Sequence, residues 1–580
     1  MRKLQKVSRW SLCLLLPCLL FCGHSAAAAE DIPPGAAIAT AHPLATRAGF
    51  QVLNQGGNAF DAAVAVSAAL AVVEPYSSGL GGGGFWLLHR ASDGRQVMID
   101  GRERAPLAAQ PDLYYDTAGQ LQPRRLLDGP LAAGIPGEPA ALAHLSEHYG
   151  RLPLAVSLEP AVRLARGGFT VDDQYRHMAS VRSDAIRQSS AARSQFLVDG
   201  DVPPPGYLLR QPDLAVTLTV LGARGKEGFY RGPVAERLIQ GVRRAGGVWS
   251  TRDLNEYRII EREPIVGTHM GWRIVSAAPP SSGGVALVQM LNMLQAVDPP
   301  AQEPIARTHL LTEVMRRAYR DRGRYLGDPD HIDIPMERLL SPHYGAGLVR
   351  GLDRDRATPS QAAADTKAEG ADTTHFSIID REGNRVAATL SINYPFGSCF
   401  VAPGTGVLLN DEMDDFAVAA GVPNAYGLVS SEANVLAPGR RMLSSMTPTF
   451  LESPESVVVL GTPGGSRIIT MVLQAALAAM DGQPLSSIVS TPRFHHQYLP
   501  DLIQHEPGAF SAEERGELEA KGHSLKQIDG GYGNMQMVRW DRTARTLDAA
   551  SDPRGVGEAG VQCTDYPCLS ILRAGVIEPF

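Results

Sequence analysis

Two helices are predicted near the start of the chain from the spacing of its apolar residues. The segment "PLATRAGFQVLNQGG" predicts a helix that begins near Pro43 and ends at the paired glycines 56–57. Asn58 follows, and its side chain is suited to cap a second helix. That helix, "AFDAAVAVSAALAVV", is apolar on nearly every side, so we expect it to be buried. A glycine-rich turn, "SGLGGGG", then leads into a predicted strand over residues 85–90, and "QVMIDG" predicts its partner strand.

A strong hairpin signal lies in the second half of the chain. Alternating side chains predict strands over residues 374–379 and 386–392, joined by the turn "REGN". If the turn is centred in that segment, Ser391 and Asn393 lie beside Thr373 on the partner strand. An ordinary hairpin would favour apolar or β-branched residues there. Two short hydrogen-bonding side chains beside a threonine therefore call for an explanation.

The residues before this hairpin predict a linker. Residues 351–372 are polar, rich in alanine and poor in aromatic side chains. A linker that delivers "DTT" directly into a strand has two interpretations. The simpler one is that threonine has a high β-propensity. The alternative is that the chain is cut before Thr373, which then becomes an N-terminal residue with chemistry of its own.

A second candidate site is "VVVLGTPGGSRIITMVLQAALAAM", in which a strand enters Gly461 and a helix starts near Ser466. A strand, glycine turn and helix N-terminus aim free backbone N–H groups at negative charge. A phosphate site is disfavoured because no Gly-Lys-Ser/Thr follows the turn. An oxyanion hole needs the same geometry and no lysine. A tight turn without any ligand is the remaining alternative.

A signal peptide is predicted over residues 1–29. Basic residues precede the apolar run "WSLCLLLPCLLFC", which is too short to span a membrane comfortably. The small residues of "SAAAAED" then offer a cleavage site after Ala29. A short uncleaved anchor is the alternative. We therefore expect a mature protein without a membrane span, located in the periplasm or secreted.

Composition narrows the function classes further. The 580 residues are 44% hydrophobic and 20% charged, which is ordinary for a globular protein. The net charge of −7 gives no electrostatic footprint for nucleic acid. Cys563 and Cys568, in "CTDYPC", could form a disulfide or remain two thiols. Nothing has zinc-ligand spacing, and "FHHQ" (His495, His496) is interpreted as a pair of surface histidines, so no metal is expected.

Eight ordered motifs together resemble the gamma-glutamyltranspeptidase family of the N-terminal nucleophile hydrolase superfamily. They are "GLGGGGFWLL", "DGRERAP", "APPSSGG", "YRDRGRYLGDPD", "DTTHFS", "NDEMDDF", "LSSMTPT" and "GTPGGSRI". The resemblance covers essentially the whole mature chain. It implies an α+β fold, a four-layer αββα sandwich formed jointly by a large fragment (residues 30–372) and a small catalytic fragment (residues 373–580) that stay associated as a heterodimer.

The resemblance also implies the chemistry. The Thr373 hydroxyl would attack the peptide bond that joins it to Asp372, and an N-to-O acyl shift and hydrolysis would cut the chain. The freed α-amine, which titrates at roughly pH 7.7–8.0, would then serve as the base for the hydroxyl of the same residue. Thr373 would attack the γ-amide of glutathione or another γ-glutamyl compound. The γ-glutamyl-enzyme would pass its acyl group to water or to an amino acid or peptide acceptor, without any cofactor.

The resemblance assigns the family's binding residues to positions in this sequence, and together they form a site for a zwitterion. Arg102 resembles the arginine that holds the substrate α-carboxylate, which suits a guanidinium fork. Ser444 and Ser445 resemble the paired serines that bond the same group. Asp415 resembles the acceptor of the α-ammonium, and Glu412 would add charge for it.

Five further residues complete the predicted site. Gly464 and Gly465 resemble the oxyanion donors. Ser391 stands where many members have threonine and keeps the hydroxyl that would bond Thr373. Asn393 would assist in binding the ammonium, and Tyr426, in a segment that resembles a lid, would reach Asn393.

Two alternatives remain open. A glutaryl or cephalosporin acylase of the same superfamily has an acyl group without an α-ammonium, so it would have less use for Asp415 and Glu412. A catalytically silent homologue that only binds is the other alternative. Retention of Thr373 and of every proposed binding group argues against it.

Overall fold

The computed structural model describes residues 32–298, 303–360, 373–563, 569–573 and 576–579. The chain divides into two compact units, Met1–Ile32 and Pro33–Phe580, and every helix and strand of the described residues belongs to the second. The predicted signal peptide and residues 361–372 of the predicted linker lie outside the described residues. Within the described part of the chain, no helix is both long enough and apolar enough to cross a membrane.

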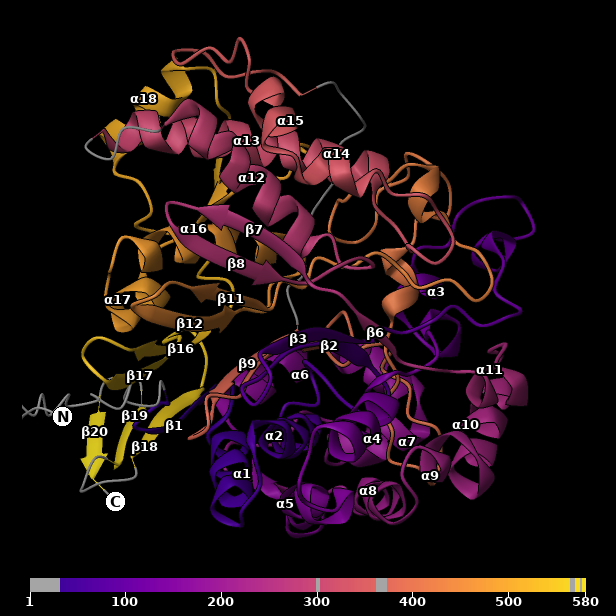
Figure 1. Ribbon diagram of the computed structural model, residues 1–580. Helices are drawn as coiled ribbons and strands as arrows, with labels where there is room; N and C mark the ends of the chain where they lie inside the picture. Colours follow the sequence, from indigo (N-terminus) through magenta and orange to yellow (C-terminus); the bar gives the residue numbers. More distant parts are fainter. Residues whose placement is uncertain (1–31, 299–302, 361–372, 564–568, 574–575, 580) are drawn as a thin grey trace, which may run out of the picture. The chain divides into compact units, whose positions relative to one another are not determined.

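Two antiparallel sheets form the centre of this unit (Figure 1). The larger has nine strands in the order β20-β19-β18-β1-β9-β10-β2-β3-β6, and the smaller has six in the order β17-β16-β12-β11-β8-β7. The strands of both are β1 (Gly35–Thr40), β2 (Gly83–Arg90), β3 (Arg95–Gly101), β6 (Ile260–Arg262), β7 (Ile265–His269), β8 (Trp272–Ser276), β9 (Thr374–Ile379), β10 (Arg385–Ser391), β11 (Thr449–Glu452), β12 (Ser456–Gly461), β16 (Gln536–Asp541), β17 (Thr546–Ser551), β18 (Glu558–Cys563), β19 (Leu569–Arg573) and β20 (Val576–Pro579). Short strands β4 (Phe169–Thr170), β5 (Leu208–Leu209), β13 (Phe494–His495), β14 (Ile503–His505) and β15 (Leu525–Gln527) form two smaller sheets.

Helices cover the outer faces of the two large sheets (Figure 1). The α-helices are α1 (Pro43–Asn54), α2 (Ala59–Val73), α3 (Arg124–Leu127), α4 (Glu138–His148), α5 (Leu154–Gly167), α6 (Asp173–Gln188), α7 (Ser190–Phe196), α8 (Pro212–Arg224), α9 (Glu227–Tyr230), α10 (Gly232–Arg244), α11 (Thr251–Asn255), α12 (Gly283–Val297), α13 (Pro304–Tyr325), α14 (Met336–Leu340), α15 (Pro342–Leu348), α16 (Ile468–Met480), α17 (Leu485–Ser490) and α18 (Ala512–Ala520). The 3₁₀ helices are η1 (Pro111–Tyr114), η2 (Pro130–Ala132), η3 (Glu412–Asp415), η4 (Glu432–Asn434) and η5 (Gly465–Arg467).

Strand alternation explains why there are two large cores. In β1, Ile38 packs with α1 and α2, whereas its neighbours Ala37 and Ala39 pack in the core that contains β12 and α16. In β2, Trp86 belongs to the first core and Phe85 to the second. The nine-stranded sheet is therefore apolar on both faces, as a layer between helices and another sheet must be. The predicted αββα sandwich is confirmed.

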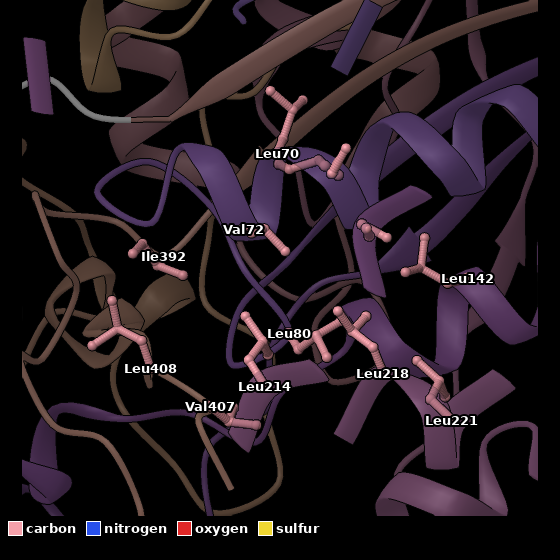
Figure 2. Close-up of a cluster of buried hydrophobic side chains, with 14 of the residues drawn as sticks. Leu70, Val72, Leu80, Leu142, Leu214, Leu218, Leu221, Ile392, Val407 and Leu408 are labelled. Atoms are coloured by element: carbon pink, nitrogen blue, oxygen red, sulfur yellow. The ribbon is translucent and has the colours of Figure 1, made fainter. Parts of the chain in front are cut away.

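The second helix shows how the local sequence produces its structure. Asn58 caps α2, since its side chain accepts from the N–H of Phe60 and Asp61, while Asp61 reaches back to the Asn58 N–H. Every residue of α2 is buried, as its all-round apolar pattern predicted. Figure 2 shows Leu70 and Val72 of this helix in a cluster with Leu214 of α8 and, from beyond Thr373, Ile392 and Leu408.

The two sides of the predicted cleavage point are interleaved in the sheets. The hairpin β9–β10 lies between β1 and β2 in the nine-stranded sheet. β7 and β8 continue the six-stranded sheet from β11. A chain cut before Thr373 would thus leave two fragments joined by several rows of backbone hydrogen bonds and by a shared core.

Candidate active site

Thr373 lies at the entrance to the predicted hairpin. Thr374 pairs with Leu390 in the β9–β10 register, which brings Thr373 beside Ser391. Their hydroxyl oxygens are 3.4 Å apart, and the Ser391 hydroxyl also accepts from the Asn393 N–H at 2.8 Å. The predicted hairpin and its register are confirmed. The alternating pattern therefore correctly predicted that the Ser391 hydroxyl lies next to Thr373.

Two cavities meet at Thr373. The first has a volume of about 20 Å³, which is room for about one water molecule. It is lined by all the predicted site residues except Gly464, namely Arg102, Thr373, Ser391, Asn393, Glu412, Asp415, Tyr426, Ser444, Ser445 and Gly465. The second has a volume of about 530 Å³, and both Thr373 and Gly464 line it. Residues from five distant motifs therefore converge on one hydroxyl, although their individual roles remain predictions.

Arg102 directly follows β3 and lies at the centre of a buried charge cluster. Its Nη2 donates to Asp415 Oδ2 at 2.5 Å, and its Nη1 lies 2.5 Å from Glu412 Oε2. Glu103 lies 3.5 Å away, and the Arg102 Nε donates to the Met442 carbonyl. Burial opposes the charge of Arg102, but these carboxylates outweigh it and raise the pKa of the guanidinium.

The carboxyl groups around Arg102 carry more potential negative charge than one guanidinium can balance. Burial raises the pKa of Glu412 to about 7, although Arg102 counteracts it, and burial also raises the pKa of Glu103. A second positive charge in this cavity would therefore be stabilised. A ligand with an α-ammonium next to an α-carboxylate would suit this cluster, because Arg102 could bind the carboxylate and the carboxyl groups could bind the ammonium.

This cluster predicts a pH dependence of ligand binding. A carboxylate attracts an ammonium group, whereas its neutral acid does not, so the inhibition constant of glutamate should fall by up to about tenfold as the pH rises from about 6 to about 8. Glu412→Gln should remove most of this change. Competition by glutamate measures binding rather than turnover, so it reports only on groups that affect the bound ligand. An unchanged pH profile in the variant would assign the titration to another group.

The glycine turn after β12 has the backbone that an oxyanion hole needs. Gly464 has φ 140° and Gly465 has φ 56°, both in the region that favours glycine. A Cβ on Gly465 would lie 2.4 Å from the Tyr426 ring. Because Gly465 opens η5, its N–H has no partner within that helix. The turn therefore offers backbone N–H groups beside Thr373.

Ser445, one of the paired serines, is held by an arginine that was not among the predicted site residues. Arg322, on α13, donates from Nη2 to the Ser445 hydroxyl at 3.1 Å and from Nε to the Ser282 hydroxyl at 2.9 Å. The Ser444 hydroxyl accepts from the Met446 N–H at 3.1 Å. Arg322 belongs to the motif "YRDRGRYLGDPD", which was the available signal for it.

Two residues of the predicted lid segment (residues 419–431), Tyr426 and Leu428, line the small cavity. The Tyr426 hydroxyl donates to the Asn393 backbone carbonyl at 3.1 Å, so the expected contact is present. Asn424 donates to Asp415 at 3.2 Å, and the Ala425 N–H donates to Asp414 at 3.0 Å. Two neighbouring carboxylates thus bond the lid, and of these Asp415 lines the small cavity.

The interpretation of "FHHQ" as surface histidines is wrong, because His495 and His496 are both buried. Gln497, next to them, connects the lid to the glycine turn. Its amide nitrogen donates to the Tyr426 carbonyl at 3.0 Å, and its oxygen accepts from the Ser466 hydroxyl at 2.7 Å. Local polarity predicted exposure here, but packing against other segments buries these side chains, with His495 against Tyr319 and His496 against Asp501.

Gln497→Leu should therefore weaken both the fold and the site. The change leaves the Tyr426 carbonyl and the Ser466 hydroxyl without this partner in a buried place, at a cost of roughly 1–3 kcal/mol. We expect a lower unfolding midpoint in denaturant and faster proteolysis within residues 419–431. Gln483→Leu, at an exposed glutamine, is the matched control. Equal stability of the two variants would contradict a connecting role for Gln497.

No group of three or more His, Cys, Asp or Glu side chains in the described part of the chain could hold a metal ion. Cys399 is a buried thiol. Cys563 is disulfide-bonded, so a free thiol at that position is excluded. Cys568 lies outside the described residues.

Comparison with known structures defines the class. The chain is similar to a cephalosporin acylase from Bacillus halodurans, with 27% identity, a TM-score of 0.80 and coverage of 91% of this chain and 96% of that one. A gamma-glutamyltranspeptidase from Helicobacter pylori matches with 36% identity and a TM-score of 0.53, over 55% of this chain and 92% of that one. With the αββα layers, these neighbours make the protein an N-terminal nucleophile hydrolase by fold.

Sequence comparison defines the family. The family profile described as gamma-glutamyltranspeptidase matches residues 45–562. A glutathione hydrolase proenzyme of Pseudomonas sp. (strain A14) is 40% identical over 532 residues, which cover 90% of this chain and 92% of the relative. The chain belongs to the gamma-glutamyltranspeptidase family and is an enzyme.

Proposed function

We propose that this protein is a γ-glutamyltransferase and glutathione hydrolase whose nucleophile is Thr373. The observation that carries the proposal is the cluster of Arg102, Glu412 and Asp415, which lines the same small cavity as Thr373. An arginine and an excess of carboxylates complement the zwitterionic end of a γ-glutamyl group. The glutathione hydrolase of Pseudomonas sp. is the relative whose activity matches this chemistry.

The nucleophile is proposed to arise by cleavage before Thr373. The resulting fragments, residues 30–372 and 373–580, would form a heterodimer. The interleaved strands support this, because each of the two large sheets takes strands from both fragments. The proenzyme name of the Pseudomonas relative agrees with maturation by cleavage. Export by the predicted signal peptide to the periplasm or beyond belongs to the same proposal.

Binding of the γ-glutamyl group requires an exchange of ion pairs. Arg102 forms ion pairs with Asp415 and Glu412, and the cavity volume of about 20 Å³ leaves room for about one water molecule. The α-carboxylate of the substrate would form the ion pair with the Arg102 guanidinium and would accept hydrogen bonds from Ser444 and Ser445. The α-ammonium would pair with the carboxylates of Asp415 and Glu412 that Arg102 releases. Each charged side chain that loses its partner in the cavity would therefore gain one from the substrate.

In the reaction, the Thr373 hydroxyl adds to the γ-amide carbon while its own α-amine accepts the proton. Negative charge develops on the carbonyl oxygen, where the N–H groups at Gly464 and Gly465 would stabilise it. The proton passes to the leaving amine as the C–N bond breaks. Water or an acceptor amine then attacks the ester and frees Thr373.

One comparison of substrates tests the proposal against the acylase alternative. The purified protein should release p-nitroaniline from γ-glutamyl-p-nitroanilide much faster than from glutaryl-p-nitroanilide, and it should convert glutathione to glutamate and cysteinylglycine. The two anilides differ in the α-ammonium that Asp415 and Glu412 would bind. A preference for the glutaryl compound would make the protein an acylase.

A further inference from the structure

The larger cavity at Thr373 has a feature that the proposed reaction does not use. An amide substrate extends in two directions from its carbonyl carbon. If its acyl part occupies the cavity of Arg102, its amine part must extend from Thr373 into the cavity of about 530 Å³. Residues of that larger cavity that lie near Thr373 would therefore contact the leaving group and, later, the acceptor.

Arg467 is a partly buried cation in the lining of this cavity. Its Nε donates to the Gln504 side chain at 3.0 Å, and its guanidinium lies 5.0 Å from the centre of the Tyr532 ring. Among the described residues, no carboxylate forms an ion pair with it. Burial lowers its pKa, and tyrosines are the groups that counteract this. A desolvated cation without a counter-ion favours an anionic ligand.

The other cations that line the cavity are either neutralised or exposed. Arg554 is paired with Glu506 at 2.6 Å and with Asp552 at 3.0 Å. Lys526 is exposed, on the short strand β15. Arg467 is therefore the lining cation best prepared to recognise an anion close to Thr373.

We propose that Arg467 binds the terminal carboxylate of the peptide portion of the substrate, both in the dipeptide that leaves glutathione and in peptide acceptors. The inference rests on the proposed function. A guanidinium offers a planar pair of N–H donors to a carboxylate, and the partial desolvation of Arg467 strengthens the attraction. Arg467 thus makes the site selective for amines that carry a carboxylate.

The test compares ligands that differ in one charge. The mature protein is assayed with glutathione and with its glycine carboxamide as donors. It is then assayed with glycylglycine and glycylglycinamide as acceptors from γ-glutamyl-p-nitroanilide. We expect the wild type to favour the carboxylate by roughly tenfold or more in kcat/KM for each pair. In Arg467→Met this ratio should fall to near one, and in Arg467→Lys it should be intermediate.

The ratio of kcat/KM for the carboxylate and the amide ligand distinguishes a role of Arg467 in binding the carboxylate from a role in supporting the neighbouring glycine turn. If Arg467 only supports that turn, both members of each pair will lose activity equally and the ratio will persist, which overturns the proposal. Lys526→Met is the matched control and should keep the wild-type ratio, whereas loss of the ratio there would assign the carboxylate to Lys526 and overturn the proposal for Arg467. A wild type without any preference also overturns the proposal, even if no variant matures. Failure of the proposed function would look different, because the wild type would turn over no γ-glutamyl donor.

Discussion

Thr373→Ala is expected to yield one uncut polypeptide without γ-glutamyl transfer or hydrolysis. The hydroxyl is the proposed nucleophile both for cutting the chain and for attacking substrate, so its removal abolishes both steps. Loss of a nucleophile costs at least about 10⁴-fold in rate. Denaturing electrophoresis with N-terminal sequencing will check the chain, and release of p-nitroaniline from γ-glutamyl-p-nitroanilide will check the activity.

Thr373→Ser is the matched control, because serine keeps the hydroxyl and, once freed, the α-amine. It should be cut at the same bond and retain part of the activity, with less rigid positioning because β-branching is lost. The alanine variant should keep the fold, since Thr373 contributes a single small side chain. Cleavage of the alanine variant at this bond, or a wild-type terminus elsewhere, would refute the mechanism.

Local sequence patterns predicted the parts of the site that local structure determines. The period of two in residues 374–392 predicted the register that brings Ser391 to Thr373, and the glycines at 464 and 465 indicated a turn, which the structure shows to have positive φ. These features depend on neighbours in the chain. For the same reason the capped helix α2 was predicted well.

Partners that lie far apart in the chain could not be obtained from spacing. Arg102 meets Asp415 across 313 positions, and only the family resemblance suggested that they share a site. Gln497 was missed because its burial depends on the lid and on the glycine turn, which are distant segments. The absence of a carboxylate paired with Arg467 among the described residues is likewise visible only after folding, since the sequence "GGSRI" gives no measure of its surroundings.

Asp415→Asn is expected to lower kcat/KM for γ-glutamyl-p-nitroanilide by the second largest factor, on the order of 10²–10³-fold. The change removes the charge proposed to bind the α-ammonium, and truncating one partner of a buried charge pair costs roughly 2–5 kcal/mol. Asparagine keeps the size of the side chain and one oxygen that can accept from Arg102, while the bond from Asn424 to the second carboxylate oxygen is lost. The loss should therefore come from recognition rather than from collapse of the site, and unfolding in denaturant will verify that stability is largely retained.

Comparison of the γ-glutamyl and glutaryl anilides shows whether Asp415→Asn loses activity because the α-ammonium is no longer bound. Glutaryl-p-nitroanilide lacks the ammonium, so its turnover should change much less, and the preference for the γ-glutamyl compound should shrink by nearly the whole factor. Asp414→Asn, at the adjacent buried carboxyl that holds the Ala425 N–H, should leave that preference near the wild-type value. If both anilides instead slowed equally in Asp415→Asn, Asp415 would act by holding Arg102 and the lid. The ammonium would then have to be bound by Glu412, whose carboxyl lines the same cavity.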